Sequence, residues 1–103
     1  ELLYQACLDG KGKLLSCKKL SQGSADCTAL SVRQVVENAL LSGASAVVLA
    51  HNHPSGVALP SQADVQATVQ VRDALKRLDI RLIDHIIVAD GDYVSMASSG
   101  LLR

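Results

Sequence analysis

The chain has 103 residues, of which 49% are hydrophobic and 19% are charged. This composition is typical of one globular domain with a modest core and excludes a disordered chain. Ten basic and ten acidic residues cancel, and the only aromatic residues are Tyr4 and Tyr93. Balanced charge removes the positive field that duplex DNA binding uses, and scarce aromatics leave few stacking surfaces for single strands. We therefore expect no direct nucleic-acid binding by this chain.

The apolar runs and the cysteines indicate the cellular compartment of the protein. No apolar run is long enough to span a membrane, and no signal-peptide pattern opens the chain. Cys7, Cys17 and Cys27 are odd in number and form no CxxC pair, which argues against a disulfide framework and a zinc finger. We interpret the compartment as the cytoplasm. Because the chain begins at Glu1 without a methionine, we expect a single domain, residues 1–103, from a longer protein.

The first half of the chain predicts a hairpin followed by a helix and a buried strand. In order, we expect a strand at 2–8, a turn at 9–12, a strand at 14–20, a loop at 22–30, a helix at 31–42 and a strand at 45–50. The turn is indicated by Asp9-Gly10, a strong hairpin signal. Ser31 is suited to cap the helix, its apolar residues recur at helical spacing, and Gly43 is placed to end it.

The second half predicts a loop, a long helix and a second hairpin. In order, we expect a loop at 51–60, a helix at 61–78, a strand at 80–89, a turn at 90–92 and a strand at 93–96. The inner stripe of the helix is expected at Val65, Val69, Leu75 and Leu78. The whole order is β-β-α-β-α-β-β, an α/β fold with a mixed sheet and antiparallel hairpins at both ends.

A group of polar side chains follows the buried strand at 45–50. Side chains two apart on a strand share a face, so His51 and His53 point the same way if the strand continues through them. Two imidazoles on one side can bind one Zn²⁺, and Asp64, in the first turn of the next helix, can fold back to supply a third ligand. Three protein ligands leave one position for water, as in a catalytic zinc site.

Simpler interpretations of these residues remain open. Ser61 and Asp64 also fit a capping box, in which Ser61 accepts from the backbone and Asp64 favours the positive end of the helix. Exposed loop histidines are frequent, so an HxH pattern by itself indicates little. The metal hypothesis gains when all four residues are considered together with the prolines and the glycine that shape the loop, Pro54, Gly56 and Pro60.

The spacing of these residues, HxHPx6SxxD from His51 to Asp64, resembles the JAMM motif of the MPN-type metallopeptidases, a family of zinc isopeptidases. The wider sequence is similar to the bacterial RadC proteins, which carry a traditional DNA-repair label. That similarity extends over nearly the whole chain. It is carried by Arg33 with 35–36 and 39–40, by 46–56, by Pro60-Ser61 with Asp64, and by 84–88.

The resemblance implies a fold and a set of roles. The fold would be a three-layer MPN sandwich related to cytidine deaminases. His51, His53 and Asp64 would bind Zn²⁺, and Ser61 would help to hold the oxyanion or the water. The family also uses a glutamate just before the first strand as general base, and Glu1 stands directly before Leu2. The chain's other glutamate, Glu37, is expected on the solvent side of its helix.

Three further polar residues have open roles. Asp84 and His85 fall in an apolar strand and point to opposite faces. His85 can be a buried histidine bonded to the backbone, or one of the pair can orient a metal ligand. Arg33 is expected to bind a carboxylate or backbone carbonyls.

The leading hypothesis is therefore a zinc-dependent hydrolase of peptide or isopeptide bonds that acts on a protein or peptide. The alternative is a non-catalytic DNA-repair or recombination accessory domain that acts through protein partners. In either case the strands 2–8 and 93–96 are expected as sheet edges that can pair with a partner segment or a second copy.

Overall fold

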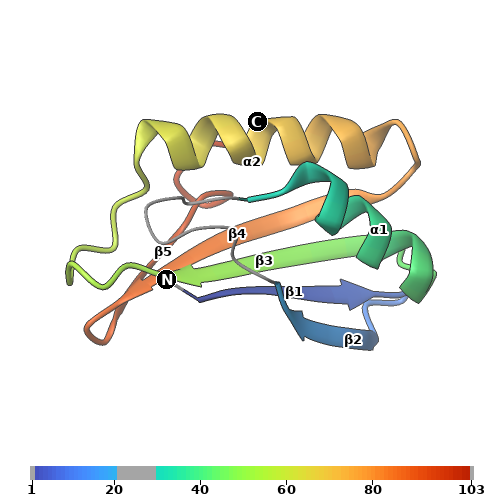
Figure 1. Cartoon of the computed structure of the whole chain (residues 1–103), viewed down its shortest axis with the longest axis horizontal. Helices are drawn as coiled ribbons and strands as arrows, with labels where there is room; N and C mark the ends of the chain where they lie inside the picture. The colour runs from blue at the N-terminus through green and yellow to red at the C-terminus, as the bar shows by residue number, and fades with distance from the viewer. Residues whose placement is uncertain (1, 21–29, 103) are drawn as a thin grey trace.

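The computed structural model describes residues 2–20 and 30–102, and Figure 1 shows their arrangement. The elements are β1 (Leu3–Leu8), β2 (Leu14–Lys19), α1 (Val32–Ser42), β3 (Ala46–Asn52), α2 (Gln62–Lys76), β4 (Arg81–Ala89) and β5 (Asp92–Ser95). The predicted α/β class and the order β-β-α-β-α-β-β are confirmed. Glu1, Cys27 and nearly all of the predicted loop at 22–30 lie outside the described residues.

The five strands form one mixed sheet in the order β2-β1-β3-β4-β5. β1 pairs antiparallel with both β2 and β3, β3 and β4 are parallel, and β4 and β5 form the closing hairpin. The predicted edge at 93–96 is confirmed by β5, but the predicted edge at 2–8 is wrong. β1 lies inside the sheet because it pairs with its hairpin partner on one side and with the distant β3 on the other, so the second edge is β2.

Both helices cover the same face of the sheet (Figure 1). The described residues therefore form two layers, which differs from the predicted three-layer sandwich. Connectivity explains the difference. The crossovers β2-α1-β3 and β3-α2-β4 each join parallel strands and advance in the same direction across the sheet. Since such connections are right-handed, both helices are placed on one face.

The core lies between this face and the two helices. Its fully buried members include Val47 and Leu49 from β3, Val35 from α1, and Val71 and Leu75 from α2. A smaller cluster, formed by Ala58, Ile87, Ala89 and Met96, packs under the second hairpin. These residues alternate along each strand with exposed or half-buried ones, so the helix-covered face holds the core and also the inward side chains of the site.

Both helices begin, and α1 ends, close to where the sequence predicts. Ser31 caps α1 by accepting from the Gln34 N–H, and Gly43 ends it with φ 66°. α2 stops at Lys76, so Leu78 is exposed instead of joining the inner stripe that we predicted. Leu40, on the apolar side predicted for α1, is likewise exposed. Neither helix in the described part of the chain is long and apolar enough to cross a membrane.

Candidate metal centre

The two histidines of the motif lie at the carboxyl end of β3. This strand continues through His51 and Asn52, further than the predicted end at residue 50, because it pairs with β1 as far as His51 and with β4 as far as Asn52. His53 follows directly, and its backbone N–H donates to the Val88 carbonyl at 2.9 Å. The side chain between the histidines is used structurally, since Asn52 Oδ1 accepts from the Leu2 N–H at 2.5 Å. The end of β3 is therefore held from both sides.

Asp64 is aimed at these histidines by the start of α2. The Ser61 hydroxyl accepts from the Asp64 N–H at 3.0 Å, and Asp64 Oδ2 accepts from the Ser61 N–H at 2.9 Å. This is the capping box that the sequence predicts. It fixes the carboxylate in the first turn, pointing back toward β3, so that capping and ligand roles are compatible.

Three potential ligand atoms converge as a result. His51 Nε2 lies 2.9 Å from His53 Nε2, and Asp64 Oδ2 lies 3.1 Å from His53 Nε2 and 3.8 Å from His51 Nε2. His51 and Asp64 are buried, and His53 is mostly so. The described residues contain no other group of three potential ligands this close together.

The remaining nitrogen of each ring is occupied by a hydrogen bond. His53 Nδ1 lies 3.1 Å from the Val57 carbonyl, which can only accept, so this nitrogen carries a hydrogen. His51 Nδ1 lies 2.6 Å from His85 Nε2. The atoms that face one another in the cluster are thus Nε2 of each motif histidine and a carboxylate oxygen.

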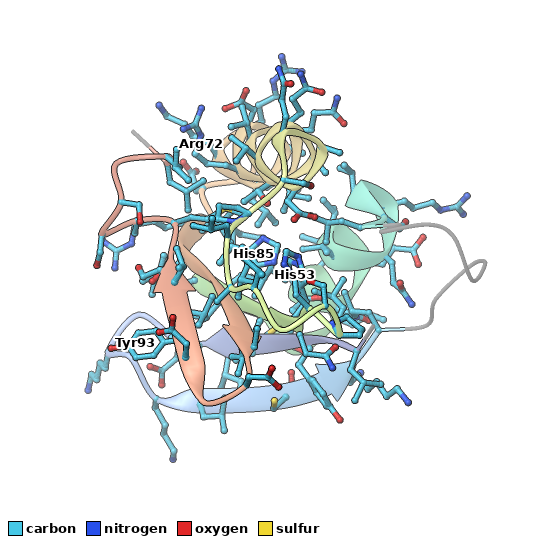
Figure 2. All side chains as sticks on the ribbon, turned by 90° about the vertical axis from the view of Figure 1, so that its left-hand side faces the viewer. His53, Arg72, His85 and Tyr93 are labelled. Carbon is cyan, nitrogen blue, oxygen red and sulfur yellow. The ribbon has the colours of Figure 1, made fainter. Side chains whose placement is uncertain are left out.

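His85 extends the cluster into the core. It is buried on β4, and its Nδ1 lies 2.7 Å from the Thr68 hydroxyl. Figure 2 shows His53 and His85 close together in the interior below α2. Burial, together with the adjacent His51, lowers the pKa of His85 to about 4, so its ring is neutral at pH 7.

The carboxyl group of Asp64 is ionised despite its position. Burial alone would raise its pKa, but hydrogen bonding to Ser61 and the nearby rings of His51 and His53 outweigh burial and hold the pKa below the ordinary value. A buried carboxylate facing two imidazole nitrogens is a site for a cation.

The separations suit a metal ion bound by all three side chains. Two ligand atoms that each lie about 2.1 Å from a tetrahedral ion stand roughly 3.4 Å apart. The observed separations of 2.9, 3.1 and 3.8 Å bracket that value. The set of two imidazoles and one carboxylate is also one that zinc uses in catalytic sites. His51, His53 and Asp64 could therefore hold a metal ion.

The other predicted residues, Ser61, Glu1, Asp84 and Arg33, are not part of the three-ligand cluster. Ser61 is exposed beside Asp64, and Glu1 lies outside the described residues. Asp84 ties β4 to the end of β5 and the residues after it, accepting from Ser95 Oγ at 2.5 Å and from the Ala97 N–H at 3.0 Å. Arg33 donates to Glu37 at 2.7 Å on the exposed side of α1, as predicted for a carboxylate partner.

Sequence reasoning missed Thr68. The available signal was its position one turn after Asp64, since residues four apart in a helix share a face. For His85, the interpretation as a backbone-bonded core histidine is wrong, because its nitrogens contact the side chains of His51 and Thr68.

Comparison with known proteins places this arrangement in a family. Residues 1–101 match the RadC-like JAB domain. The chain is 50% identical over 93 residues to a UPF0758 protein of Stutzerimonas stutzeri, a match that covers 90% of this chain and 42% of the relative. It is 46% identical over 95 residues to one from Cellvibrio japonicus, covering 92% and 42%, and 47% identical over 93 residues to one from Alcanivorax borkumensis, covering 90% and 42%.

The chain therefore spans less than half the length of these curated relatives, whose name, UPF0758 protein, states no activity. The family match covers nearly the whole chain, including the cluster of His51, His53 and Asp64. The chain belongs to the RadC-like JAB domain family.

Proposed function

We propose that this domain is a zinc-dependent hydrolase of peptide or isopeptide bonds. The observation that carries the proposal is the convergence of His51 Nε2, His53 Nε2 and Asp64 Oδ2, on side chains that are buried or mostly buried. When bound, Zn²⁺ would act as a Lewis acid and make a water molecule more acidic at neutral pH. Family membership supports the proposal, because the fold is the one in which JAMM-type ligand sets occur.

The chain's own residues would divide the remaining work. His51, His53 and Asp64 would hold the ion and leave a position for water, because three potential ligands converge among residues 2–20 and 30–102. Ser61 would donate its hydroxyl hydrogen to the oxyanion of the attacked carbonyl. Its oxygen already accepts from the Asp64 N–H, and among the described residues its hydrogen has no acceptor. This hydroxyl is thus held in a fixed place beside a ligand.

Glu1 is our candidate for the general base, which would take a proton from water and give it to the leaving amine. It precedes Leu2, whose N–H donates to Asn52 between the two histidines, and Leu3 pairs with His51. Leu2, the sequence neighbour of Glu1, therefore lies beside Asn52, the residue between the two motif histidines.

We further propose that the substrate is an extended peptide or a lysine-linked branch, and that the setting is the reducing cytoplasm. Both described cysteines, Cys7 and Cys17, are free. Either edge strand, β2 or β5, has the unpaired backbone groups that can bind an extended segment or a second copy. Nucleic acid is not proposed as a ligand, because the net charge is zero.

The test is cleavage of a mixed library of internally quenched peptides and lysine-branched isopeptides by the zinc-loaded protein. Asp64→Asn is expected to lose zinc and cleavage together. Glu1→Gln is expected to keep zinc but lose roughly 10²–10⁴-fold in cleavage rate, because only proton transfer is removed. Zinc content is measured by elemental analysis on the same samples.

Matched controls come from the same chain. Asp73→Asn changes an exposed carboxylate on α2, and Glu37→Gln changes the exposed glutamate of α1. Both are expected to retain zinc and activity. A zinc-loaded wild type that cleaves no more of the library than Asp64→Asn would overturn the hydrolase assignment and return attention to a non-catalytic accessory role.

A further inference from the structure

We propose that Thr68 and His85 form a one-way chain of hydrogen bonds that fixes His51 in the tautomer able to bind a metal. The inference rests on the proposed function, because it takes His51 Nε2 as a metal ligand. Thr68 and His85 would then be positioning residues. They are assigned no contact with metal or substrate, and they decide which nitrogen of His51 is available.

The direction of the hydrogen-bond chain is set at its first link, between Thr68 and Asp64. The Thr68 hydroxyl donates to the Asp64 backbone carbonyl at 2.7 Å. A carbonyl oxygen can only accept, and a hydroxyl has one hydrogen to give. The Thr68 oxygen therefore meets His85 Nδ1, 2.7 Å away, as an acceptor. His85 must carry its hydrogen on Nδ1.

The second link passes this choice to His51. A neutral histidine has one ring hydrogen, so His85 Nε2 is left with a lone pair. It lies 2.6 Å from His51 Nδ1, which must donate. His51 is thereby the Nδ1–H tautomer, and its Nε2 lone pair faces the lone pair of His53 Nε2 at 2.9 Å, so that with Asp64 Oδ2 three acceptor atoms converge where a cation would bind. The hydrogen-bond chain therefore begins at the backbone carbonyl of one potential ligand residue, Asp64, and ends at the ring of another, His51.

Burial strengthens the control that this chain of hydrogen bonds has over the His51 tautomer. Thr68 is 0%, His85 2% and His51 6% exposed, so water does not compete readily for these hydrogen bonds. Every buried side-chain nitrogen and oxygen in the described part of the chain has a partner. Reversing only one of the two links would leave two hydrogens or two lone pairs facing each other, which is costly in a buried network, so both links must run in the same direction.

The reverse direction defines a clear alternative. If the Thr68 hydroxyl donated to His85 Nδ1, His85 would carry its hydrogen on Nε2 and donate it to His51 Nδ1. His51 would then hold its own hydrogen on Nε2, pointing into the cluster where a metal would bind. The two directions thus predict opposite tautomers of His51 before any metal is added.

The first experiment reads the tautomer directly in the metal-free protein. Nitrogen-15 NMR with long-range proton correlation distinguishes Nδ1–H from Nε2–H histidines, and mildly alkaline buffer keeps the rings neutral. We expect both His51 and His85 as Nδ1–H. Finding His51 as Nε2–H would overturn the proposal, and this result needs no variant to fold.

The second experiment measures zinc affinity by competition with a chelating dye. Thr68→Val keeps the shape but removes the hydroxyl, so His85 loses the partner that selects its tautomer. We expect roughly 10–100-fold weaker zinc binding and a mixture of His51 tautomers. Thr68→Ser keeps the hydroxyl and should restore both readouts.

A control variant removes a half-buried hydroxyl contact away from the cluster. Ser42→Ala breaks the Ser16–Ser42 contact of 2.9 Å and should leave zinc affinity unchanged. Thr68→Val that binds zinc as tightly as wild type would overturn the proposal. A wild type with the expected tautomers that binds no zinc would overturn the zinc site of the proposed function, while supporting the hydrogen-bond chain.

Discussion

At the scale of single residues, the candidate centre is organised by hydrogen bonds to its three potential ligand side chains. His53 Nδ1 is held by the Val57 carbonyl, His51 Nδ1 by His85, and Asp64 Oδ2 by the Ser61 N–H. Each partner fixes an orientation that the ligand atom alone would not have. Metal sites depend on such outer partners for both geometry and ligand basicity.

Gly56 gives a test of this organisation at one residue. It has φ 85°, and a Cβ there would lie 2.5 Å from Asp90 Oδ2. The Asp90 carboxylate is the end of an exposed side chain and can move aside, but the backbone strain at φ 85° remains. Gly56→Ala should therefore disturb the turn next to the Val57 carbonyl, weaken zinc binding, and lower the free energy of unfolding by about 1–2 kcal/mol. Urea unfolding and dye competition measure the two effects.

Gly12→Ala is the matched control. Gly12 lies in the β1–β2 turn and has the same φ of 85°, but a Cβ added there would meet open space. It should lose similar stability through backbone strain and keep full zinc affinity. Equal zinc affinities for the two variants would contradict a role for the 53–57 loop in holding His53.

At the scale of elements, local patterns explain most of what the sequence predicts. Helical spacing, the caps Ser31 and Ser61, and the turn glycines located every helix and strand to within a few residues. The end of β3 differs from the prediction for a nonlocal reason, and the end of α2 differs at a local turn. β3 runs through Asn52 because β1 and β4 flank it. α2 stops early, at Lys76, and the chain then turns at Asp79, which has φ 58°.

The cap of α2 provides the prediction at this scale. The hydroxyls of Ser61 and Ser31 accept from the third residue of their helices at 3.0 and 3.1 Å, so the two caps are alike. Ser61→Ala and Ser31→Ala should each cost about 1 kcal/mol of stability, measured by urea unfolding. Only Ser61→Ala should also lower kcat, by roughly 10²–10³-fold if its hydroxyl serves the oxyanion.

The pair separates capping from catalysis. A Ser61→Ala variant whose kcat matches that of Ser31→Ala would confine Ser61 to the cap. A rate loss with unchanged zinc content would instead assign the effect to the hydroxyl, because the Ser61 N–H that holds Asp64 remains in the variant.

At the scale of the whole molecule, strand pairing is what the sequence could not supply. Nothing local in residues 2–8 distinguishes an edge strand from one that pairs with Ala46–Asn52, where paired residues are 38 to 48 positions apart. The same long-range pairing brings His85 next to His51, since Leu49 and His85 are partners in the β3–β4 register. The ligands were recognisable from spacing, but Thr68 and His85 became interpretable only once β4 and α2 were placed together.

This buried placement of His85 makes the stability of the whole fold depend on pH. The pKa of His85 is about 4 in the folded protein, against 6.5 for an ordinary histidine. Between these two pH values the unfolded chain binds a proton at this residue and the folded protein does not. The free energy of unfolding of the metal-free protein should therefore fall by about 3 kcal/mol as pH drops from 6.5 to 4. That is a large part of the 5–15 kcal/mol typical of a domain.

Asp64 acts in the same direction at lower pH. Its pKa is held below 3.8 in the fold, so the stability that it contributes is present above that pH and is lost as pH falls through the folded value. Urea unfolding at a series of pH values measures the combined slope, and His85→Gln, which cannot titrate, should flatten it between pH 6.5 and 4. An unchanged slope in that variant would mean that other groups, and not the ring beneath the candidate metal centre, carry the acid sensitivity.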